Sequence, residues 1–243
     1  MKKFIFILSV LVLIAGVVGG IIFRTQYVFL DDKVYKKDVK ELDLYYSDND
    51  VDELNKCSEL EELKIRRIDD EFLTEMRTFQ HLEHFTVFSS DIINDGMSKI
   101  NSFPILNNMF IAYSHIDFGN IQNDSVKEIS IWLSEITNIK GLANCRSLTD
   151  LELLNIAMDN KIIVTKVANT LDRKYTLKDS SDFSYLDNIK TLRIVGIDIE
   201  DISGFTKMDS LETLTVSQGY ISEENISALE NNGITVIIEN KEE

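Results

Sequence analysis

The chain has 243 residues, of which 44% are hydrophobic and 27% charged, a composition that predicts a folded domain and excludes general disorder. Asp and Glu number 41 against 25 Lys and Arg, which gives a net charge of −16. Residues 1–30 contain three basic residues and no acidic one, so residues 31–243 carry 22 basic against 41 acidic residues, or −19. This balance argues against a nucleic-acid partner and against a domain that lies on an anionic lipid surface.

The first 24 residues are expected to be a membrane segment. Phe4 to Phe23 is an uninterrupted run of 20 apolar, Gly or Ser residues, and as a helix it would span about 30 Å, the thickness of a bilayer core. The length of the run favours an uncleaved signal anchor that crosses the membrane as a single transmembrane helix. A cleaved signal peptide is the alternative, and a buried core helix is a third reading.

Charged residues on both sides of this run bear on its orientation. Lys2 and Lys3 favour a cytoplasmic N-terminus, although Arg24 and three lysines follow the run. We expect a single-pass protein of the cell membrane with residues 25–243 on the extracytoplasmic side, or a secreted protein.

Beyond the membrane segment, a pattern of apolar residues repeats along the chain. Its clearest copy is residues 126–147, and counting Val126 as position 1 the apolar residues fall at positions 1, 4, 6, 11, 14, 17 and 20. The first three positions recur eight times, and successive copies begin 21, 22, 24, 20, 22, 41 and 22 residues apart. They are Val39/Leu42/Leu44, Leu60/Leu63/Ile65, Leu82/Phe85/Val87, Leu106/Met109/Ile111, Val126/Ile129/Ile131, Leu148/Leu151/Leu153, Ile189/Leu192/Ile194 and Leu211/Leu214/Val216. A period of 20 to 29 residues with this LxxLxL core predicts stacked strand-plus-turn units.

The unit at Val126 and its near twin at Ile189 resemble the leucine-rich repeat family, specifically the 22-residue bacterial type of internalin-like surface proteins. The resemblance implies an α/β solenoid, a horseshoe of about eight repeats over residues 39–238 with a parallel sheet on its concave face. Because strand side chains alternate, positions 4 and 6 are expected in the core and positions 3, 5 and 7 outside.

One feature of the family pattern is absent. The family usually has an Asn at position 9 that ties neighbouring loops together, and a regular superhelix depends on it. This chain has other residues there: Ser47, Ile68, Ser90, Ser114, Ser134, Ile156, Ile197 and Gly219.

Further segments complete the predicted organisation. Residues 25–38 are expected to be a linker and N-terminal cap, Ile234 to Ile238 a last strand, and residues 239–243 a polar tail. The 41-residue interval places an insertion at about 158–181, predicted to be a short hairpin on the convex side or a degenerate extra repeat. Asp70–Phe79 and Ser222–Glu230 are predicted to be helical, the latter with Ser222 as its N-cap.

Motifs of catalysis and metal binding are missing from the sequence. It contains no GxSxG, P-loop or HExxH motif, and its histidines, His81, His84 and His115, occupy unrelated repeat positions. We therefore expect no enzyme activity, no metal and no cofactor. An enzyme with an active site in the insertion is a further alternative, but residues 158–181 contain no convergent set of nucleophile, base or metal ligands.

The two cysteines are expected to be separate core residues. Cys145 is at position 20 of its repeat, and Cys57 is at the corresponding place four repeats earlier, three residues before the next copy begins. Four repeats correspond to roughly 20 Å at about 4.8 Å per strand. A disulfide allows a Cα separation of only about 7 Å. The sequons at Asn123 and Asn225 are common by chance in a chain of this composition.

Outward positions near the middle of the predicted sheet are rich in aromatic residues. Contiguous exposed apolar surface of this kind marks interaction sites, and Trp and Tyr are favoured anchors. The predicted partner-binding residues are Tyr45, Phe88, Phe110, Tyr113, Trp132 and Leu154. Two readings compete with this one: the insertion or the N-terminal segment covers these side chains, or a one-residue register slip turns them inward.

The sequence thus predicts a membrane-anchored or secreted module that binds a protein or peptide through its concave face. The acidic outward residues Glu62, Glu128, Asp150 and Glu152 would steer a basic partner. A structural or accessory subunit of a membrane complex, with the aromatic residues permanently covered, is the alternative.

Overall fold

The computed structural model describes residues 25–45, 50–159, 161–166 and 173–240. The apolar run 4–23, and with it the predicted membrane segment, lies outside this range. No helix among the described residues is long and apolar enough to cross a membrane.

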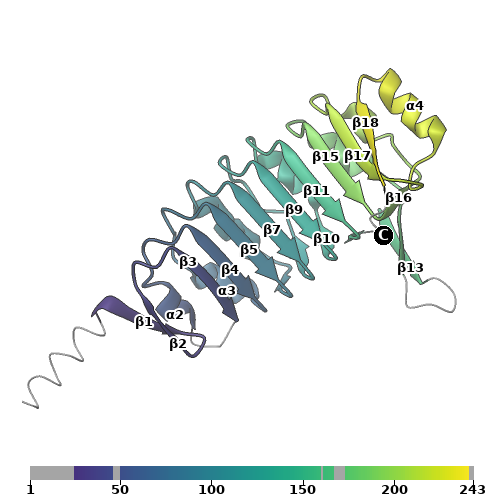
Figure 1. Cartoon of the computed structure of the whole chain (residues 1–243). Coiled ribbons are helices and arrows are strands. Elements are labelled where there is room, and N and C mark those ends of the chain that lie inside the picture. Colours follow the sequence, from purple (N-terminus) through teal and green to yellow (C-terminus); the bar gives the residue numbers. More distant parts are fainter. Residues whose placement is uncertain (1–24, 46–49, 160, 167–172, 241–243) are drawn as a thin grey trace, which may run out of the picture.

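Nine parallel strands, one from each repeat and a last one from the C-terminus, form the long sheet that runs the length of the molecule (Figure 1). Its strands lie side by side in chain order, as the predicted solenoid requires. They are β3 (Glu41–Tyr45), β4 (Glu62–Arg66), β5 (His84–Phe88), β7 (Asn108–Ala112), β9 (Glu128–Trp132), β11 (Asp150–Leu154), β15 (Thr191–Val195), β17 (Thr213–Ser217) and β18 (Thr235–Glu239).

Shorter elements return the chain from one long-sheet strand to the next. Most of the short strands form a second sheet: β6 (Asp91–Ile92), β8 (His115–Asp117), β10 (Glu135–Thr137), β12 (Ala157–Met158), β13 (Ile162–Lys166), β14 (Arg173–Leu177) and β16 (Ile197–Ile199). The other returning elements are helical turns: α2 (Asp50–Leu54), α3 (Asp70–Glu75), η1 (Gly96–Ser102), η2 (Ile139–Asn144), η3 (Ser181–Tyr185), η4 (Phe205–Lys207) and α4 (Glu223–Asn231).

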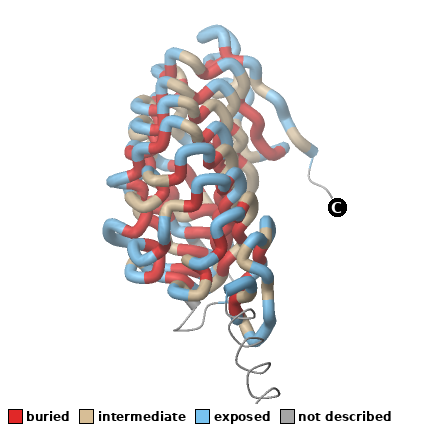
Figure 2. Tube along the Cα trace, turned by 90° about the vertical axis from the view of Figure 1, so that its left-hand side faces the viewer, coloured by how far each residue is buried: buried red, intermediate tan, exposed pale blue. Residues whose placement is uncertain are grey.

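The core lies between the long sheet and these returning elements (Figure 2). The residues at positions 4 and 6 of all eight repeats are at most 3% exposed. Strand pairing keeps them in line, for example Leu42 beside Leu63 and Leu63 beside Phe85. The register slip considered from the sequence is therefore absent from these strands, and positions 3, 5 and 7 point away from the core.

Six strands of the long sheet, from β4 to β15, end in a tight corner at position 8. Arg67, Ser89, Tyr113, Leu133 and Asn155 have φ between 47° and 59°, and Gly196 has φ 71°. In this left-handed conformation each N–H turns toward the next repeat, and Tyr113, for example, donates to the Trp132 carbonyl at 3.1 Å.

A serine ladder at position 9 performs part of the role expected of asparagine. The Ser114 hydroxyl accepts a hydrogen bond from Ser90 N–H at 3.1 Å and donates to the Ala112 carbonyl at 2.9 Å. Ser90 and Ser134 repeat this pattern one repeat before and one after. Because all three hydroxyl groups are buried and paired, the corners are tied together without an amide side chain.

Two glycines allow close contact between successive convex turns. A Cβ atom on Gly141 would lie 2.0 Å from the Phe118 carbonyl oxygen, and one on Gly204 would lie 1.7 Å from that of Ser180. Both glycines are at position 16 of their repeats, so the two clearest units of the sequence share this packing.

The insertion contains an antiparallel hairpin. β13 and β14 pair from Ile162 beside Leu177 to Lys166 beside Arg173. β13 also joins β12, and β14 runs parallel to β16, so the hairpin is part of the second sheet. The insertion therefore forms a hairpin, which is one of the two alternatives predicted from the sequence. The hairpin connects β12 to β16 within the second sheet.

The ends of the solenoid are closed in different ways. At the N-terminus, β1 (Tyr27–Leu30) and β2 (Lys33–Lys36) form a hairpin that buries Val28 and Leu30 against the first repeat. At the C-terminus, the predicted helix is confirmed: the Ser222 hydroxyl caps α4 by accepting from Asn225 N–H at 3.2 Å. Glu239, which the sequence assigned to a polar tail, instead ends β18 because its backbone pairs with Ser217.

Three residues singled out from the sequence lie in the interior. Cys57 and Cys145 are free, buried core residues, as predicted. Asn123 is 4% exposed, and its amide donates to the carbonyls of Ile100 and Phe103. The Asn of the first sequon is thus a buried residue whose side-chain amide is hydrogen-bonded within the core.

Candidate protein-binding face

Five side chains form a row across the outward face of the long sheet, and we refer to it as the aromatic ladder. The Arg66 guanidinium lies 4.7 Å from the centre of the Tyr45 ring and 5.3 Å from that of Phe88. Phe110 continues the row, with ring centres 5.6 Å from Phe88 and 5.0 Å from Trp132, both edge to face. The ladder therefore links β3, β4, β5, β7 and β9 through cation–π and aromatic contacts.

The row is continuous because one of its side chains comes from position 5 of its repeat and the others come from position 7. Tyr45, Arg66, Phe88 and Trp132 are at position 7, but on β7 that position is Ala112, which is 1% exposed. Phe110, at position 5, occupies the space beside Phe88 and Trp132 that the short alanine leaves. Ala112, expected outside, is therefore buried beneath its neighbours.

Charged residues continue the row beyond Trp132. The indole Nε1–H donates to Glu152 Oε2 at 3.1 Å, and Glu152 pairs with Arg193. Arg193 also pairs with Glu239 at 2.7 Å, and this hydrogen bond holds the pKa of Glu239 below its usual range. The ordered row thus reaches from β3 to β18.

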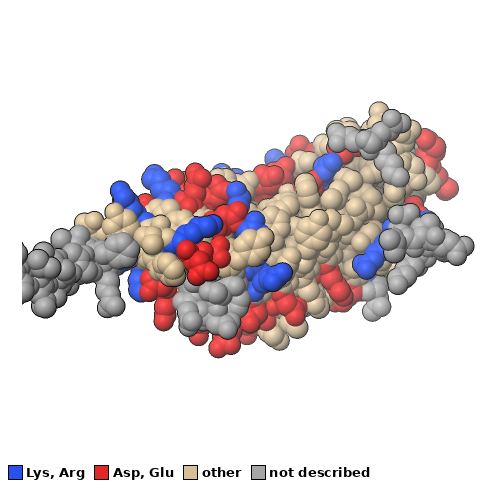
Figure 3. Space-filling view, turned by 60° about the horizontal axis from the view of Figure 1, so that its bottom comes forward, with Lys and Arg blue, Asp and Glu red and all other residues tan. Residues whose placement is uncertain are grey.

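The outward face of the long sheet is strongly acidic. Its three basic residues are all paired: Lys64 with Glu62, Arg66 with Asp43, and Arg193 with Glu152 and Glu239. Glu128 and Asp150 are side by side on neighbouring strands, and no ion pair among the described residues includes either of them. Figure 3, which looks toward the strand ends, shows a broad area of uncharged side chains bordered by both acidic and basic ones.

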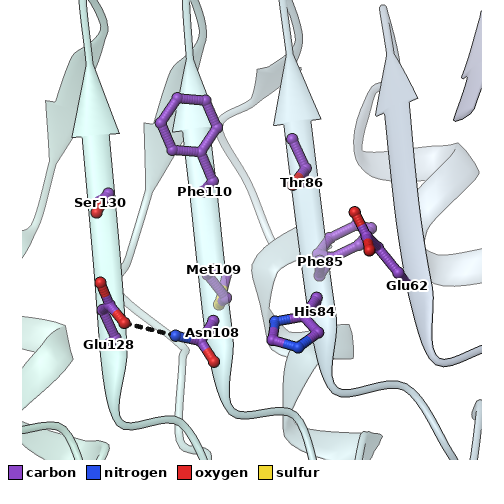
Figure 4. Close-up of a pocket in the computed structure, with 9 residues that line it drawn as sticks. All are labelled: Glu62, His84, Phe85, Thr86, Asn108, Met109, Phe110, Glu128 and Ser130. Atoms are coloured by element: carbon purple, nitrogen blue, oxygen red, sulfur yellow. Dashed lines mark hydrogen bonds between the residues drawn. The ribbon is translucent and has the colours of Figure 1, made fainter.

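A shallow hollow opens beside Phe110 (Figure 4). Thr86 and Ser130 flank this ring on the neighbouring strands, and their short side chains leave the space open. Asn108 donates to Glu128 at 2.6 Å along one border, and His84 and Glu62 line the other.

A second depression, the side groove, lies where the strands of the long sheet end. Its apolar lining includes Tyr113, which is 62% exposed, and Leu133, which is 38% exposed, both in the left-handed corners. Val164 and Tyr175 of the hairpin contribute to the same groove. A left-handed backbone conformation costs free energy in any residue other than glycine. Tyr113 and Leu133 adopt it with apolar side chains exposed, so a contribution to folding stability does not by itself explain these two residues.

The similarity to known structures is limited to the fold. No family model matches the sequence, and no curated protein does either. Internalin C2 from Listeria monocytogenes matches with a TM-score of 0.55 at 17% identity, over 86% of each chain. Internalin F from the same organism matches with a TM-score of 0.54 at 15% identity, over 84% of this chain and 56% of the other. The chain has the leucine-rich repeat fold. The expected resemblance to the internalin type is confirmed at that level.

Within this leucine-rich repeat fold, four of the six predicted contact residues lie together. Tyr45, Phe88, Phe110 and Trp132 belong to the aromatic ladder, and Tyr45 and Trp132 are 54% and 37% exposed. Leu154 is half-buried beside Trp132 on the next strand. Tyr113 is apart from them at its corner, because position 8 leaves the sheet.

The sequence predicted a steering role for acidic residues of this face but not the contacts of its two arginines. Arg66 was visible at position 7, but nothing in the repeat pattern predicts that it lies between two rings. Arg193 and Glu239 are 46 residues apart, beyond the reach of any local motif.

The three histidines are dispersed over the repeats. His84 borders the hollow, His115 faces Asp91 at 3.5 Å, and His81 faces Glu59 at 3.9 Å. In the described part of the chain, no cluster of three or more His, Cys, Asp or Glu residues is arranged to hold a metal ion.

Proposed function

We propose that this leucine-rich repeat protein binds a protein or peptide partner through the aromatic ladder on the outward face of its long sheet. The observation that supports this most directly is the exposure of Tyr45 and Trp132 at the two ends of the ladder. Trp132 is on the central strand β9 and Tyr45 on the edge strand β3, and large aromatic side chains exposed on a rigid sheet offer contact area at a low entropic cost. Solenoids commonly use such extended faces for binding.

The arrangement of the hairpin removes one objection to this proposal. From the sequence, the insertion was a candidate to fold over the aromatic residues. Its described strands instead join the second sheet, and the ladder stays open to solvent as far as the described residues extend. Trp132 is therefore accessible to a partner in the described part of the chain.

Electrostatics favour a partner with a basic surface. The outward face has seven acidic residues and three basic ones, and each basic residue already pairs with an acidic neighbour. The acidic residues are Glu41, Asp43, Glu62, Glu128, Asp150, Glu152 and Glu239. A field of this sign accelerates association with a cationic partner and is screened by salt.

A photo-crosslinking experiment tests the proposal. A photoreactive amino acid replaces Trp132 in the full chain in its native membrane, and the attached partner is identified. Phe88→Ala combined with Trp132→Ala should abolish capture of that partner in a pull-down while leaving the thermal midpoint within a few degrees. The matched control is Phe29→Ala with Tyr185→Ala, because both rings are exposed outside the ladder. Normal capture by the ladder variant, or its unfolding, would contradict the proposal.

We also propose that residues 1–24 hold the repeats at a membrane, or direct their secretion. The support is the uninterrupted apolar run of the sequence. Membranes washed with alkaline carbonate should retain the protein if the segment is an anchor, whereas a secreted protein appears in the medium without residues 1–24. Sizing after mild detergent extraction distinguishes the accessory-subunit alternative, which requires a stoichiometric complex.

A further inference from the structure

The hollow beside Phe110 combines an aromatic wall with an uncompensated negative charge. Phe110 stands between the short side chains of Thr86 and Ser130, and Glu128 lies at the border of the hollow. Glu62, at the opposite border, already pairs with Lys64 at 2.5 Å. Among the described residues, the Glu128 carboxylate receives one hydrogen bond, from Asn108, and has no cationic partner.

Asp150 increases the negative charge at this border. It is the direct register partner of Glu128 on the adjacent strand, and its own contact is a hydrogen bond from the Thr149 hydroxyl. Like charges opposite one another on neighbouring strands destabilise a sheet. A cation bound between the ring and the carboxylates would relieve this repulsion.

The same face already contains an arginine in such surroundings. The Arg66 guanidinium lies between the Tyr45 and Phe88 rings while pairing with Asp43. Two rings and a carboxylate on neighbouring strands of this sheet therefore hold a planar cation. The hollow offers one ladder ring, Phe110, and the Glu128 carboxylate, and no arginine that the structure describes lines it.

We infer that the hollow is a specificity pocket for an arginine side chain of the partner. The guanidinium contacts the Phe110 ring and pairs with Glu128, with Asp150 adding to the attraction. A guanidinium suits this site better than an ammonium because it contacts rings and carboxylates through separate parts of one planar group. This inference rests on the proposed function, since it names the chemistry by which the same face selects its partner.

A small probe tests the pocket without knowledge of the partner. The full chain, labelled with ¹⁵N-asparagine and solubilised in a non-ionic detergent, is titrated with N-acetyl-arginine amide. We expect the side-chain amide signal of Asn108 to shift because this amide bonds to Glu128. N-acetyl-citrulline amide, which has nearly the same shape but no charge, should leave the signal in place.

Two variants show where the probe binds. Glu128→Gln, which keeps an acceptor for Asn108, should weaken the probe by at least about fivefold, because the charge-assisted bond is lost. Glu41→Gln removes a negative charge at the same repeat position, position 3, but outside the hollow, and it should have little effect on binding of the probe. An equal response to citrulline, or an equal loss in both variants, would overturn the inference.

The outcomes separate this inference from the proposed function. If the probe fails while the ladder variant still loses its partner, the arginine pocket is wrong and the binding face stands. If the probe binds but the ladder variant captures its partner normally, the proposed function is wrong.

Discussion

Trp132 donates its indole hydrogen bond to Glu152 on the adjacent strand, 20 residues later in the sequence, at 3.1 Å. This contact joins the aromatic half of the outward face to its charged half, because Glu152 also pairs with Arg193. The indole is consequently held by Phe110 on one side and by a carboxylate on the other. A partner that binds at the proposed face would meet a ring whose orientation is already fixed, which lowers the entropy lost on binding.

Glu152→Ala should release the indole. Trp132 is the only tryptophan of the chain, so its fluorescence reports on this position alone. We expect a red-shifted emission maximum and faster quenching by acrylamide in the alanine variant, as the ring becomes more mobile and hydrated. Glu152→Gln retains an acceptor for the indole and should stay close to the wild type. Identical spectra for the alanine variant and the wild type would show that the hydrogen bond does not hold the ring.

Ser114→Ala should destabilise the solenoid. The substitution leaves the buried N–H of Ser90 without an acceptor, for which we expect a loss of about 1–3 kcal/mol in the free energy of unfolding. Urea denaturation measures the difference. Ser184→Ala is the control, because its exposed hydroxyl makes one local bond and its loss should change little. Equal effects of the two substitutions would argue against a serine ladder that ties the corners together.

Cys57 should be unreactive in the folded protein. Burial raises the pKa of its thiol to about 11, so at pH 8 the reactive thiolate is scarce as well as inaccessible. A thiol reagent at pH 8 should modify neither cysteine until guanidinium unfolds the chain. Because the folded pKa is raised, this contribution to stability is complete below the unfolded value and is lost as the pH rises toward 11. Rapid modification of the native protein would contradict the burial.

Asp179→Asn should slightly lower the free energy of unfolding, by an amount that depends on pH, because Asp179 pairs with Lys161 of the hairpin. Hydrogen bonds from Lys161 at 2.5 Å and from Ser181 hold the pKa of Asp179 well below its usual range. The resulting stabilisation is present above the unfolded pKa of about 3.9 and is lost as the pH falls through the lower folded value. The pair is partly exposed, so we expect at most about 1 kcal/mol at pH 7 and a smaller difference at pH 3.

Urea denaturation at both pH values measures this difference. In a Lys161→Met background, Asp179→Asn should lose most of its effect, because the main partner is gone. An unchanged effect in that background would assign the stabilisation to Ser181 alone.

The repeat period was sufficient to predict the core and the long sheet. Positions 4 and 6 recur with apolar residues, so both the register and the outward orientation of Trp132 followed from counting. The place of Phe110 did not follow, because it depends on how much space the Ala112 side chain leaves on the same strand. Counting assigns a side chain to a face but does not say which neighbour it contacts.

Two other features depended on contacts that the pattern does not encode. The absence of Asn at position 9 suggested an irregular stack, yet serine hydroxyl groups bond across the same corners. The pairing of Arg193 with Glu239 needs β18 to lie two strands away from β15, which is known only once the stack is assembled.

The backbone hydrogen bonds at the corners of the solenoid all run in the same direction along the chain. At position 8 the backbone donor belongs to the earlier repeat and the acceptor to the later one, from Arg67 with Phe88 to Gln218 with Glu239. A growing chain that emerges from the ribosome therefore always has one open corner, which the following repeat closes. β18 closes the final corner, so loss of these few residues would leave the finished solenoid in the state of an interrupted translation product.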